Sequence, residues 1–356
     1  MKNVIVRWCY KNERAFEEFA PLKFVGERNQ KLGFSNDMHI VLLDGFDRLS
    51  EHYKISLKNL GYTLHDASKS YKYFEEKYHQ LHRFTDYEKK CFLRWLVIDQ
   101  IFFGEKIIHY DGDIVFNEDP EIISKKVAGK TFVLQGCPAF TVISDVNWFE
   151  QYIKAFDEFA NNIEAYSENA WKQRDGWEVT FRTRWSGSRF KKIISSDQDF
   201  LSHLMHTGQI KQDSIESIML SLKDYVVFQN PLFIHFYDDN APFSYQRENG
   251  IDYFLCNRQD GKKCFYKKKV LLWHMQSSFN FYLSKFIMRR KFLPFFIFNR
   301  LSTDLEYKSL EKKINVKLRR FVNYSRRSYV YDYFFNKTDF KKIFTNKMWW
   351  KQGVFK

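Results

Sequence analysis

Long apolar runs are missing from this sequence: none approaches the roughly 18 to 20 residues that a membrane-spanning helix needs. Residues 1–7 also lack the apolar core of a signal peptide. The five cysteines are odd in number and scattered, and no His or Cys partners complete a zinc pattern around them. We therefore expect a cytoplasmic protein with reduced thiols that neither spans a membrane nor depends on disulfides.

Positive charge is abundant but unevenly distributed along the chain. Lys and Arg outnumber Asp and Glu by 57 to 43, a net charge of +14. The 82 residues from Met275 onward hold 19 basic and 5 acidic residues, so the first 274 hold 38 of each. With 44% hydrophobic residues, most of the chain is expected to fold. We expect a globular domain over residues 1–275 and a basic, mainly helical region over residues 276–356 that has an acidic partner.

Short apolar segments alternate with segments of helical periodicity in the first 275 residues. Strand, helix and strand at this spacing predict an α/β fold with a mostly parallel sheet, right-handed crossovers and flanking helices. We expect strands at residues 3–8, 38–43, 62–64, 106–116, 131–135, 139–144, 226–231, 233–236 and 270–274. We expect helices at residues 15–20, 70–82, 87–103 and 146–160, and one that starts at residue 197.

Ligands of such sheets bind beyond the carboxyl ends of the strands. Those ends are expected at Cys9–Tyr10, at Asp44–Gly45 and at Asp111-Gly112-Asp113. Together they define the predicted pocket, in which Asp44 would contact the ligand. Tyr10 could stack on a nucleotide base, and a plain core or rim aromatic is the alternative.

The triplet Asp111-Gly112-Asp113 carries the main chemical signal. In an extended backbone both carboxylates project from one face, about 7 Å apart at Cα, and repel each other unless a cation or a proton intervenes. Gly112 leaves room for a ligand to approach the backbone. Chance alone gives about 1.5 Asp-x-Asp triplets in a chain with 23 Asp, so a solvated turn is the alternative to a Mg²⁺ or Mn²⁺ site carrying a diphosphate.

The apolar helix followed by GEKIIHYDGDIVFNEDPEII resembles the metal-binding segment of GT-A fold glycosyltransferases. The resemblance implies a Rossmann-like GT-A domain. It also implies that Asp111 and Asp113 hold a divalent metal, which bridges the two phosphates of a nucleotide sugar. Asp197-Gln198 is similar to the pair that starts a helix in retaining members, such as glycogenin-like enzymes and bacterial lipopolysaccharide galactosyltransferases. In these enzymes the pair faces the donor sugar, and retention is therefore favoured here.

Departures from that pattern leave alternatives open. Ser202 stands where the family usually has Asn, and Asp197 could serve simply as a helix N-cap. For an inverting enzyme, Asp199 or a carboxylate in residues 161–190 would be the general base. His274 ends an apolar segment where the family often places its last metal ligand, and neutral imidazole suits Mn²⁺. The family's Lys-Pro-Trp is absent after His274, however, and a satisfied surface histidine is the alternative.

Arg94 lies inside the apolar segment 87–103, and a buried guanidinium requires a partner. A donor phosphate is one candidate, since the family places a basic residue on this helix near the sugar nucleotide. A carboxylate such as Asp99 or Asp44 is the other. Residues 161–190, rich in Trp and Arg, could stack on sugars and pair with phosphates, or form a covering loop around core tryptophans.

The function implied is a hexosyltransferase-type glycosyltransferase with a nucleotide-sugar donor and a saccharide or lipid-linked acceptor. Bacterial surface polysaccharide synthesis follows only by analogy. Another metal-dependent phosphate enzyme is the first alternative, but nucleotidyltransferases of this fold usually open with a glycine-rich phosphate loop, which residues 4–14 lack. A non-enzymatic basic protein that binds membrane or nucleic acid is the second.

The basic region from residue 276 interleaves Lys and Arg with aromatic residues. Such segments bind anionic membrane surfaces, where each basic residue contributes on the order of 1 kcal/mol. Nucleic-acid binding or packing on the globular domain are the alternatives, but no nucleic-acid module is recognisable and we expect no nucleic-acid partner. We expect a cytoplasmic protein attached peripherally to the inner face of a membrane.

Overall fold

The structure is a computed structural model, and it describes residues 1–8, 22–112, 114–134, 137–173, 194–226, 243–256 and 266–274. The chain divides into two compact units, each described here by itself. The first unit comprises Met1–Glu13, Asp37–Gly112 and Glu121–Leu222, and the second comprises Arg14–Asn36, Asp113–Pro120 and Lys223–Lys356. The expected helix at 15–20, the expected strand at 233–236 and the basic region 276–356 lie outside the described residues.

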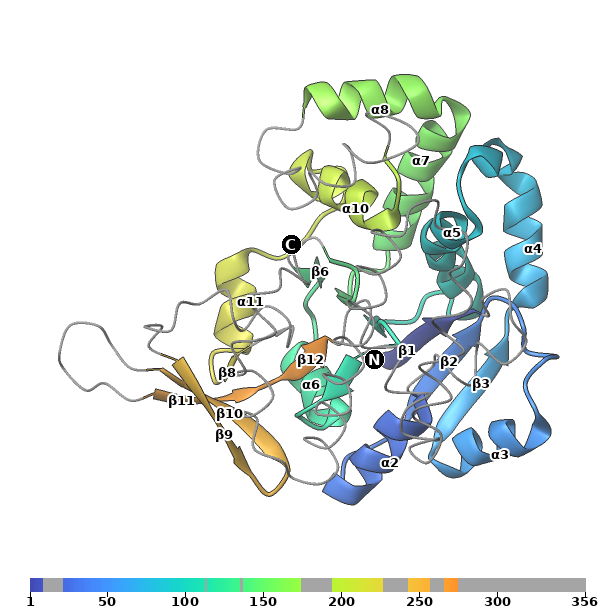
Figure 1. The fold of residues 1–356 in the computed structure, drawn as a ribbon. Helices are drawn as coiled ribbons and strands as arrows, with labels where there is room; N and C mark the ends of the chain where they lie inside the picture. Colours follow the sequence, from blue (N-terminus) through green and yellow to red (C-terminus); the bar gives the residue numbers. More distant parts are fainter. Residues whose placement is uncertain are drawn as a thin grey trace, which may run out of the picture. The chain divides into compact units, whose positions relative to one another are not determined.

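A six-stranded sheet forms the centre of the first unit, in the order β3-β2-β1-β4-β7-β6 (Figure 1). Strands β1, β2, β3 and β4 are parallel, and β7 pairs antiparallel with β4 and with β6. The α/β class with a mostly parallel sheet is therefore confirmed. The strands are β1 (Lys2–Arg7), β2 (Met38–Leu42), β3 (Tyr62–Asp66), β4 (Ile107–Tyr110), β6 (Phe132–Val133) and β7 (Phe140–Ile143).

Helices flank this sheet, and one of them lies in residues 161–190, for which a covering loop was one of the two expectations. Asn162 caps α8 by accepting the backbone N–H of Ala165, and Ile163, Ser167 and Ala170 are buried, so this part of residues 161–190 is a helix and the loop expectation is wrong for it. The helical segments are α3 (Glu51–Asn59), α4 (Ser68–Lys77), the 3-10 helix η1 (His79–Arg83), α5 (Asp86–Ile101), α7 (Trp148–Asn161), α8 (Ile163–Lys172), α10 (Asp197–His206) and α11 (Ile215–Ser221). Helix α6 (Pro120–Lys126) begins one residue before Glu121, where the last segment of the first unit starts.

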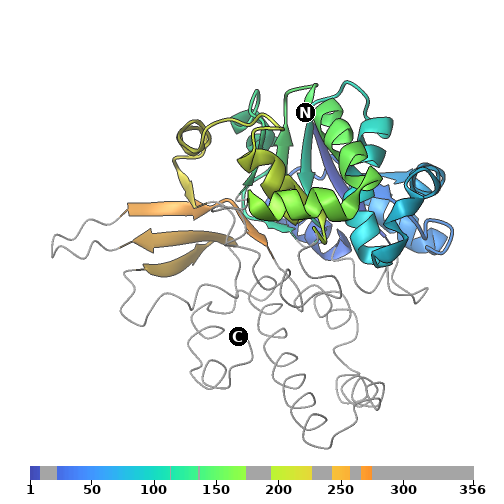
Figure 2. The ribbon, with the colours of Figure 1, turned by 90° about the horizontal axis from the view of Figure 1, so that it is seen from above.

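Helix α5 is the central helix of the first unit, and its sequence explains its position. Thr85 and Glu88 form a capping box that satisfies the first backbone donors. All residues from Lys90 to Ile98 are buried, as expected for a helix that is apolar on nearly every side. Val4 and Val6 of β1 belong to the same core as α5. In both views α7, α8 and α10 lie together (Figure 1, Figure 2), and the tilted rings of Phe159 of α7 and Phe200 of α10 lie 5.2 Å apart.

The second unit contains two small sheets and helix α2 (Leu22–Leu32). Its four-stranded sheet has the order β8-β11-β10-β9, with β8 (Tyr225–Val226), β9 (Phe243–Glu248), β10 (Ile251–Cys256) and β11 (Tyr266–Val270). Asn249 and Gly250, with φ of 51° and 83°, form the two-residue turn between β9 and β10. This Asn-Gly signal predicts such a hairpin turn. β5 (Ile114–Phe116) pairs antiparallel with β12 (Leu272–His274).

The chain does not stay extended through residues 106–116, and that expectation is wrong. β4 ends at Tyr110, the backbone turns at Gly112, and β5 belongs to another sheet. Asp111 donates its N–H to Ala139 in the first unit, whereas Asn117 and Glu118 both donate theirs to Leu271 in the second. The two strands follow different hydrogen-bonding partners, so the triplet lies at a change of sheet.

Among the described residues, no helix combines the length and apolarity required to cross a membrane. The longest, α5, has 16 residues, fewer than the roughly 20 that a span needs.

Candidate functional site

The carboxyl edge of the parallel strands of the first unit holds a group of charged side chains. β1 ends at Arg7, Leu43 and Asp44 follow β2, and Asp111 follows β4. The register that pairs Ile5 with Tyr110 places these strand ends beside one another. The expected convergence of strand ends is therefore seen for β1, β2 and β4, although β1 ends earlier than the expected Cys9–Tyr10, and both of those residues lie outside the described part.

Asp111 faces a guanidinium and an imidazole. Its Oδ1 accepts a hydrogen bond from Nη1 of Arg94 at 2.8 Å, and Nε2 of His109 lies 3.4 Å from the same oxygen. The side chain of Asp111 is 30% exposed, so the carboxylate is reachable from solvent. Asp111 can therefore accept an external cation or donor while Arg94 holds its Oδ1.

Arg94 joins Asp111 to Asp197. The side chain is only 5% exposed, and its Nε and Nη2 lie 2.8 and 2.5 Å from Oδ2 of Asp197. Arg94 thus has carboxylate partners, but neither Asp99 nor Asp44 is among the contacts seen. Burial acts to lower the pKa of Arg94, yet the two carboxylates outweigh it and raise that pKa well above the ordinary value. One buried cation therefore holds two carboxylates from different segments.

Asp197 is the first residue of α10 and is 2% exposed. Its Oδ2 also accepts the indole N–H of Trp95 at 3.0 Å. The N-cap reading is wrong, because the carboxylate of Asp197 points to Arg94 and Trp95, while Asp199 accepts the backbone N–H and hydroxyl of Ser195 at 3.2 and 2.8 Å. Burial, with Asp111 adding to it, raises the pKa of Asp197 against the opposing effect of Arg94.

His109 completes the buried group, and the sequence argument did not single it out. The residue is fully buried on β4, and its ring meets the face of Trp95 at a centroid distance of 5.1 Å. Burial lowers its pKa, so the imidazole is neutral near pH 7. The sequence did contain a signal for His109: residues two apart in a strand project from the same face, and His109 lies two residues before Asp111. Two carboxylates, one guanidinium and a neutral imidazole leave this group with one net negative charge.

Two other residues that were predicted to contact the nucleotide-sugar donor lie near this edge. Asp44 pairs with Lys90 at 2.7 Å and with Arg48 at 3.9 Å. Gln198, next to Asp197 on the first turn of α10, is half-buried. Both positions are compatible with ligand contact, which stays a prediction.

The space above Gly112 is filled by Arg7. A Cβ atom at Gly112 would lie 2.4 Å from Cδ and 2.6 Å from Nη1 of Arg7. The missing side chain thus accommodates an arginine of β1, whereas the sequence suggested a ligand there. Trp8, the next residue, meets Tyr87 of α5 edge to face at 5.6 Å, and Tyr87 is 51% exposed. Neither Arg7 nor this aromatic pair was predicted, since the expected strand, residues 3–8, continued through both Arg7 and Trp8.

His274 belongs to the second unit and is 2% exposed, so the surface-histidine reading is wrong. It lies opposite Ile114 in the β12–β5 pairing, and Ile114 directly follows Asp113 in the sequence. The pairing therefore brings the backbone of His274 next to the end of the triplet. Asp113 and Tyr10 lie outside the described residues.

Carboxylate and imidazole donors are a suitable set for Mn²⁺. Of the three predicted ligands, the described part contains Asp111, whose carboxylate is reachable, and His274, paired beside the residue after Asp113. Within that part, no three His, Cys, Asp or Glu side chains are grouped closely enough to hold a metal. The residues present have side chains of the types that bind a divalent ion.

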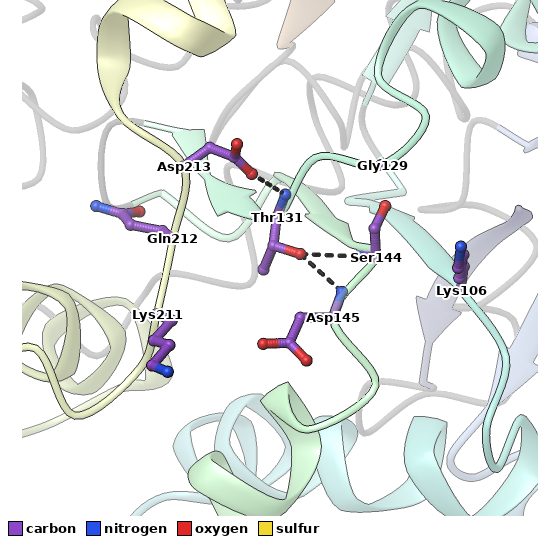
Figure 3. Close-up of a pocket in the computed structure, with 8 residues that line it drawn as sticks. All are labelled: Lys106, Gly129, Thr131, Ser144, Asp145, Lys211, Gln212 and Asp213. Carbon is purple, nitrogen blue, oxygen red and sulfur yellow. Dashed lines mark hydrogen bonds between the residues drawn. The ribbon is translucent and has the colours of Figure 1, made fainter.

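A pocket of about 430 Å³ lies at the opposite edge of the same sheet (Figure 3). Lys106, which precedes β4, and Ser144, which follows β7, are among its lining residues. Thr131 Oγ1 accepts the backbone N–H groups of Ser144 and Asp145 at 3.0 and 2.8 Å, and Asp213 accepts that of Thr131 at 2.7 Å. The side chains of Thr131 and Asp213 thus bind backbone groups, and the pocket is separate from the charged edge.

Comparisons with models of protein families, with curated proteins and with solved structures find no match. The geometry of the charged edge is therefore the basis on which a function can be argued.

Proposed function

We propose that the protein is a metal-dependent glycosyltransferase that transfers a sugar from a nucleoside-diphosphate donor to a saccharide or lipid-linked acceptor. The observation that carries this proposal is the ion cluster in which Arg94 joins Asp111 to Asp197. Asp111 opens the triplet and Asp197 opens the Asp-Gln pair. These are two of the three motifs on which the resemblance to GT-A enzymes rests, and they are found in one cluster.

Asp111 and Asp113, with His274, are the candidate metal ligands. A bound Mn²⁺ or Mg²⁺ would supply positive charge to the departing diphosphate. Asp111 can take part because its side chain is 30% exposed while Arg94 fixes one of its oxygens. A ligating carboxylate held by a second hydrogen-bonding partner is oriented before the metal arrives.

Asp197 and Gln198 are the candidates for contact with the donor sugar. Arg94 and Trp95 donate to the carboxylate of Asp197 and hold it in one orientation. A fixed carboxylate near the sugar carbon would stabilise positive charge developing there. Retention of configuration is favoured, on the Asp-Gln resemblance alone.

Two alternatives to this function remain, and each predicts a different reaction product or none. A nucleotidyltransferase or phosphatase would use the same carboxylates for a different bond, and a basic binding protein would release no product. Asp199 is a poor general base for an inverting reaction, because its carboxylate accepts two hydrogen bonds from Ser195 and the residue is fully buried.

The test is donor hydrolysis by the full chain. The protein is incubated with a panel of sugar nucleotides and Mn²⁺, and free nucleoside diphosphate is measured with and without chelator. We expect release with at least one donor, loss of release with chelator, and loss in Asp111→Asn. Release from no donor would contradict the proposal, and release of nucleoside monophosphate or inorganic phosphate would favour the other phosphate enzymes.

The membrane partner is tested separately by truncation after residue 277. We propose that the full chain pellets with anionic vesicles and that the truncated chain does not. Equal pelleting of the two chains would contradict a membrane role for the basic region, as would pelleting of neither.

A further inference from the structure

Arg7 occupies a position that the proposed function leaves unassigned. It is the last residue of β1, the strand that lies between β2 and β4 in the sheet. The parallel register pairs Ile5 with Tyr110. Continued by two residues, that register brings Arg7 level with Gly112. The side chain therefore meets the middle of the triplet from the neighbouring strand.

The packing of Arg7 on Gly112 is close enough to explain the glycine. A Cβ atom at residue 112 would lie 2.4, 2.6 and 2.9 Å from Cδ, Nη1 and Nε of Arg7. Real Cβ atoms do not approach other heavy atoms so closely, so any other residue at 112 would displace the arginine. Arg7 is half-buried. The guanidinium thus lies against the backbone of the triplet.

Two further cations of this edge, Arg94 and Lys90, contact carboxylates. Arg94 is buried and directs Nε, Nη1 and Nη2 at Asp111 and Asp197. Lys90 pairs with Asp44 at 2.7 Å.

We propose that Arg7 binds the diphosphate of the nucleotide donor, an inference that rests on the proposed function. A guanidinium presents parallel N–H donors that match two phosphate oxygens, which makes arginine well suited to this contact. Gly112 has a defined part in this arrangement: it keeps the arginine against the triplet. Arg7 is a binding residue for the leaving group, distinct from Arg94, which positions Asp197.

The test measures binding of inorganic pyrophosphate and of UDP, GDP, ADP and CDP, each with Mn²⁺, by calorimetry on the full chain. Arg7→Met keeps the apolar stem and removes the charge, and Arg7→Lys keeps the charge without the planar fork. We expect Arg7→Met to weaken pyrophosphate binding at least about tenfold, with Arg7→Lys between it and wild type. Arg83→Met, which removes a cation paired with Glu164 elsewhere, is the matched control and should leave binding unchanged.

A second pair of variants separates phosphate binding from mere packing. Gly112→Ala should weaken pyrophosphate binding when Arg7 is present, because the new methyl group displaces the guanidinium. In the Arg7→Ala background the same change should have no further effect, which a double-mutant cycle measures directly. Thermal unfolding of each variant identifies any that fail to fold, and Arg7→Lys and Gly112→Ala keep the test open if Arg7→Met is one of them.

The outcomes distinguish this inference from the proposed function. Pyrophosphate binding that is equal in wild type, Arg7→Met and Gly112→Ala would overturn the inference, as would a wild type that binds no pyrophosphate. Donor hydrolysis unaffected by Arg7→Met would overturn the inference alone. Pyrophosphate binding that requires Arg7, in a protein that hydrolyses no sugar nucleotide, would support the inference and contradict the proposed function.

Discussion

The two edges of the central sheet satisfy their polar groups in opposite ways. At the edge lined by Thr131 and Asp213, side chains accept backbone N–H groups and so complete the fold. At the carboxyl edge, the charges of Arg94, Asp111 and Asp197 mostly face one another, and two of the three side chains, Arg94 and Asp197, are buried from solvent. Buried ion pairs add little stability and often cost some, because desolvation offsets their attraction. The difference indicates that the first edge supports the fold, whereas the second holds charges suited to a reaction.

Removal of Arg94 should give the largest loss of stability, and it tests the difference between the two edges most directly. Arg94→Met leaves the carboxylate of Asp197 buried without its main partner, and we expect a loss of about 3 to 5 kcal/mol in the free energy of unfolding. Lys130→Met is the matched change at the other edge, where the Nζ of Lys130 lies 3.6 Å from Asp213 on a partly exposed side chain. It should cost about 1 kcal/mol or less. Urea titration measures both, and equal losses would contradict the contrast.

The pH dependence of α10, which carries Asp197, should come next. His203 is buried on this helix, and burial, with His206 adding to it, lowers its pKa to about 4. The unfolded chain takes up this proton near the ordinary value of 6.5 while the folded chain does not. Stability is therefore lost as the pH falls from about 6.5 to about 4, by up to about 3 kcal/mol. Unfolding measured between pH 7 and pH 4 should show a smaller loss in His203→Leu than in wild type, and parallel curves would refute the assignment.

Substitution of Asp111 should separate activity from stability. Asp111→Asn keeps the shape of the side chain but removes a candidate metal ligand, and donor hydrolysis should fall by about 100-fold or more. Asp213→Asn at the opposite edge should leave hydrolysis unchanged. The rate of nucleoside diphosphate release, with unfolding curves as a check on folding, measures both. A rate in Asp111→Asn within twofold of wild type would exclude Asp111 from the reaction.

Substitution of Thr131 should have a smaller effect than removal of Arg94, and it should change stability without changing hydrolysis. Thr131→Val removes the oxygen that accepts the N–H groups of Ser144 and Asp145, and we expect a cost of about 1 to 3 kcal/mol in the free energy of unfolding. Hydrolysis should not change at temperatures where the variant is folded. A variant with wild-type stability and reduced hydrolysis would reverse the roles assigned to the two edges.

Local patterns in the sequence were sufficient to predict the helices and the strand that carry the charged residues of the carboxyl edge. The apolar segment around Arg94 predicted a buried helix, and the segment before Asp111 predicted a buried strand; both are confirmed. The helix that begins at Asp197 was also predicted. These predictions succeed because apolar periodicity and start signals act over a few neighbouring residues.

Contacts between distant segments could not be predicted in the same way. The partner of Arg94 was sought at Asp99 or Asp44, yet one of its carboxylates comes from residue 197, which is 103 residues away in sequence. A turn at Gly112 was only the alternative reading, because the change of sheet depends on strand pairing. The contact of Gly112 with Arg7 depends on register and was not predicted. The cap reading of Asp197 failed because Asp199 takes the nearby donors of Ser195. Register and side-chain pairing are properties of the assembled fold.

The bridge made by Arg94 has a consequence for the order of folding. The helix with Arg94 and the strand before Asp111 are synthesised well before the segment that supplies Asp197. Until that later segment docks, the guanidinium has only Asp111 and lacks the second of its two carboxylate partners, so partly assembled chains are penalised. The side chain that holds both carboxylates therefore makes assembly more nearly all-or-none, because nascent intermediates without α10 gain little by compacting around it.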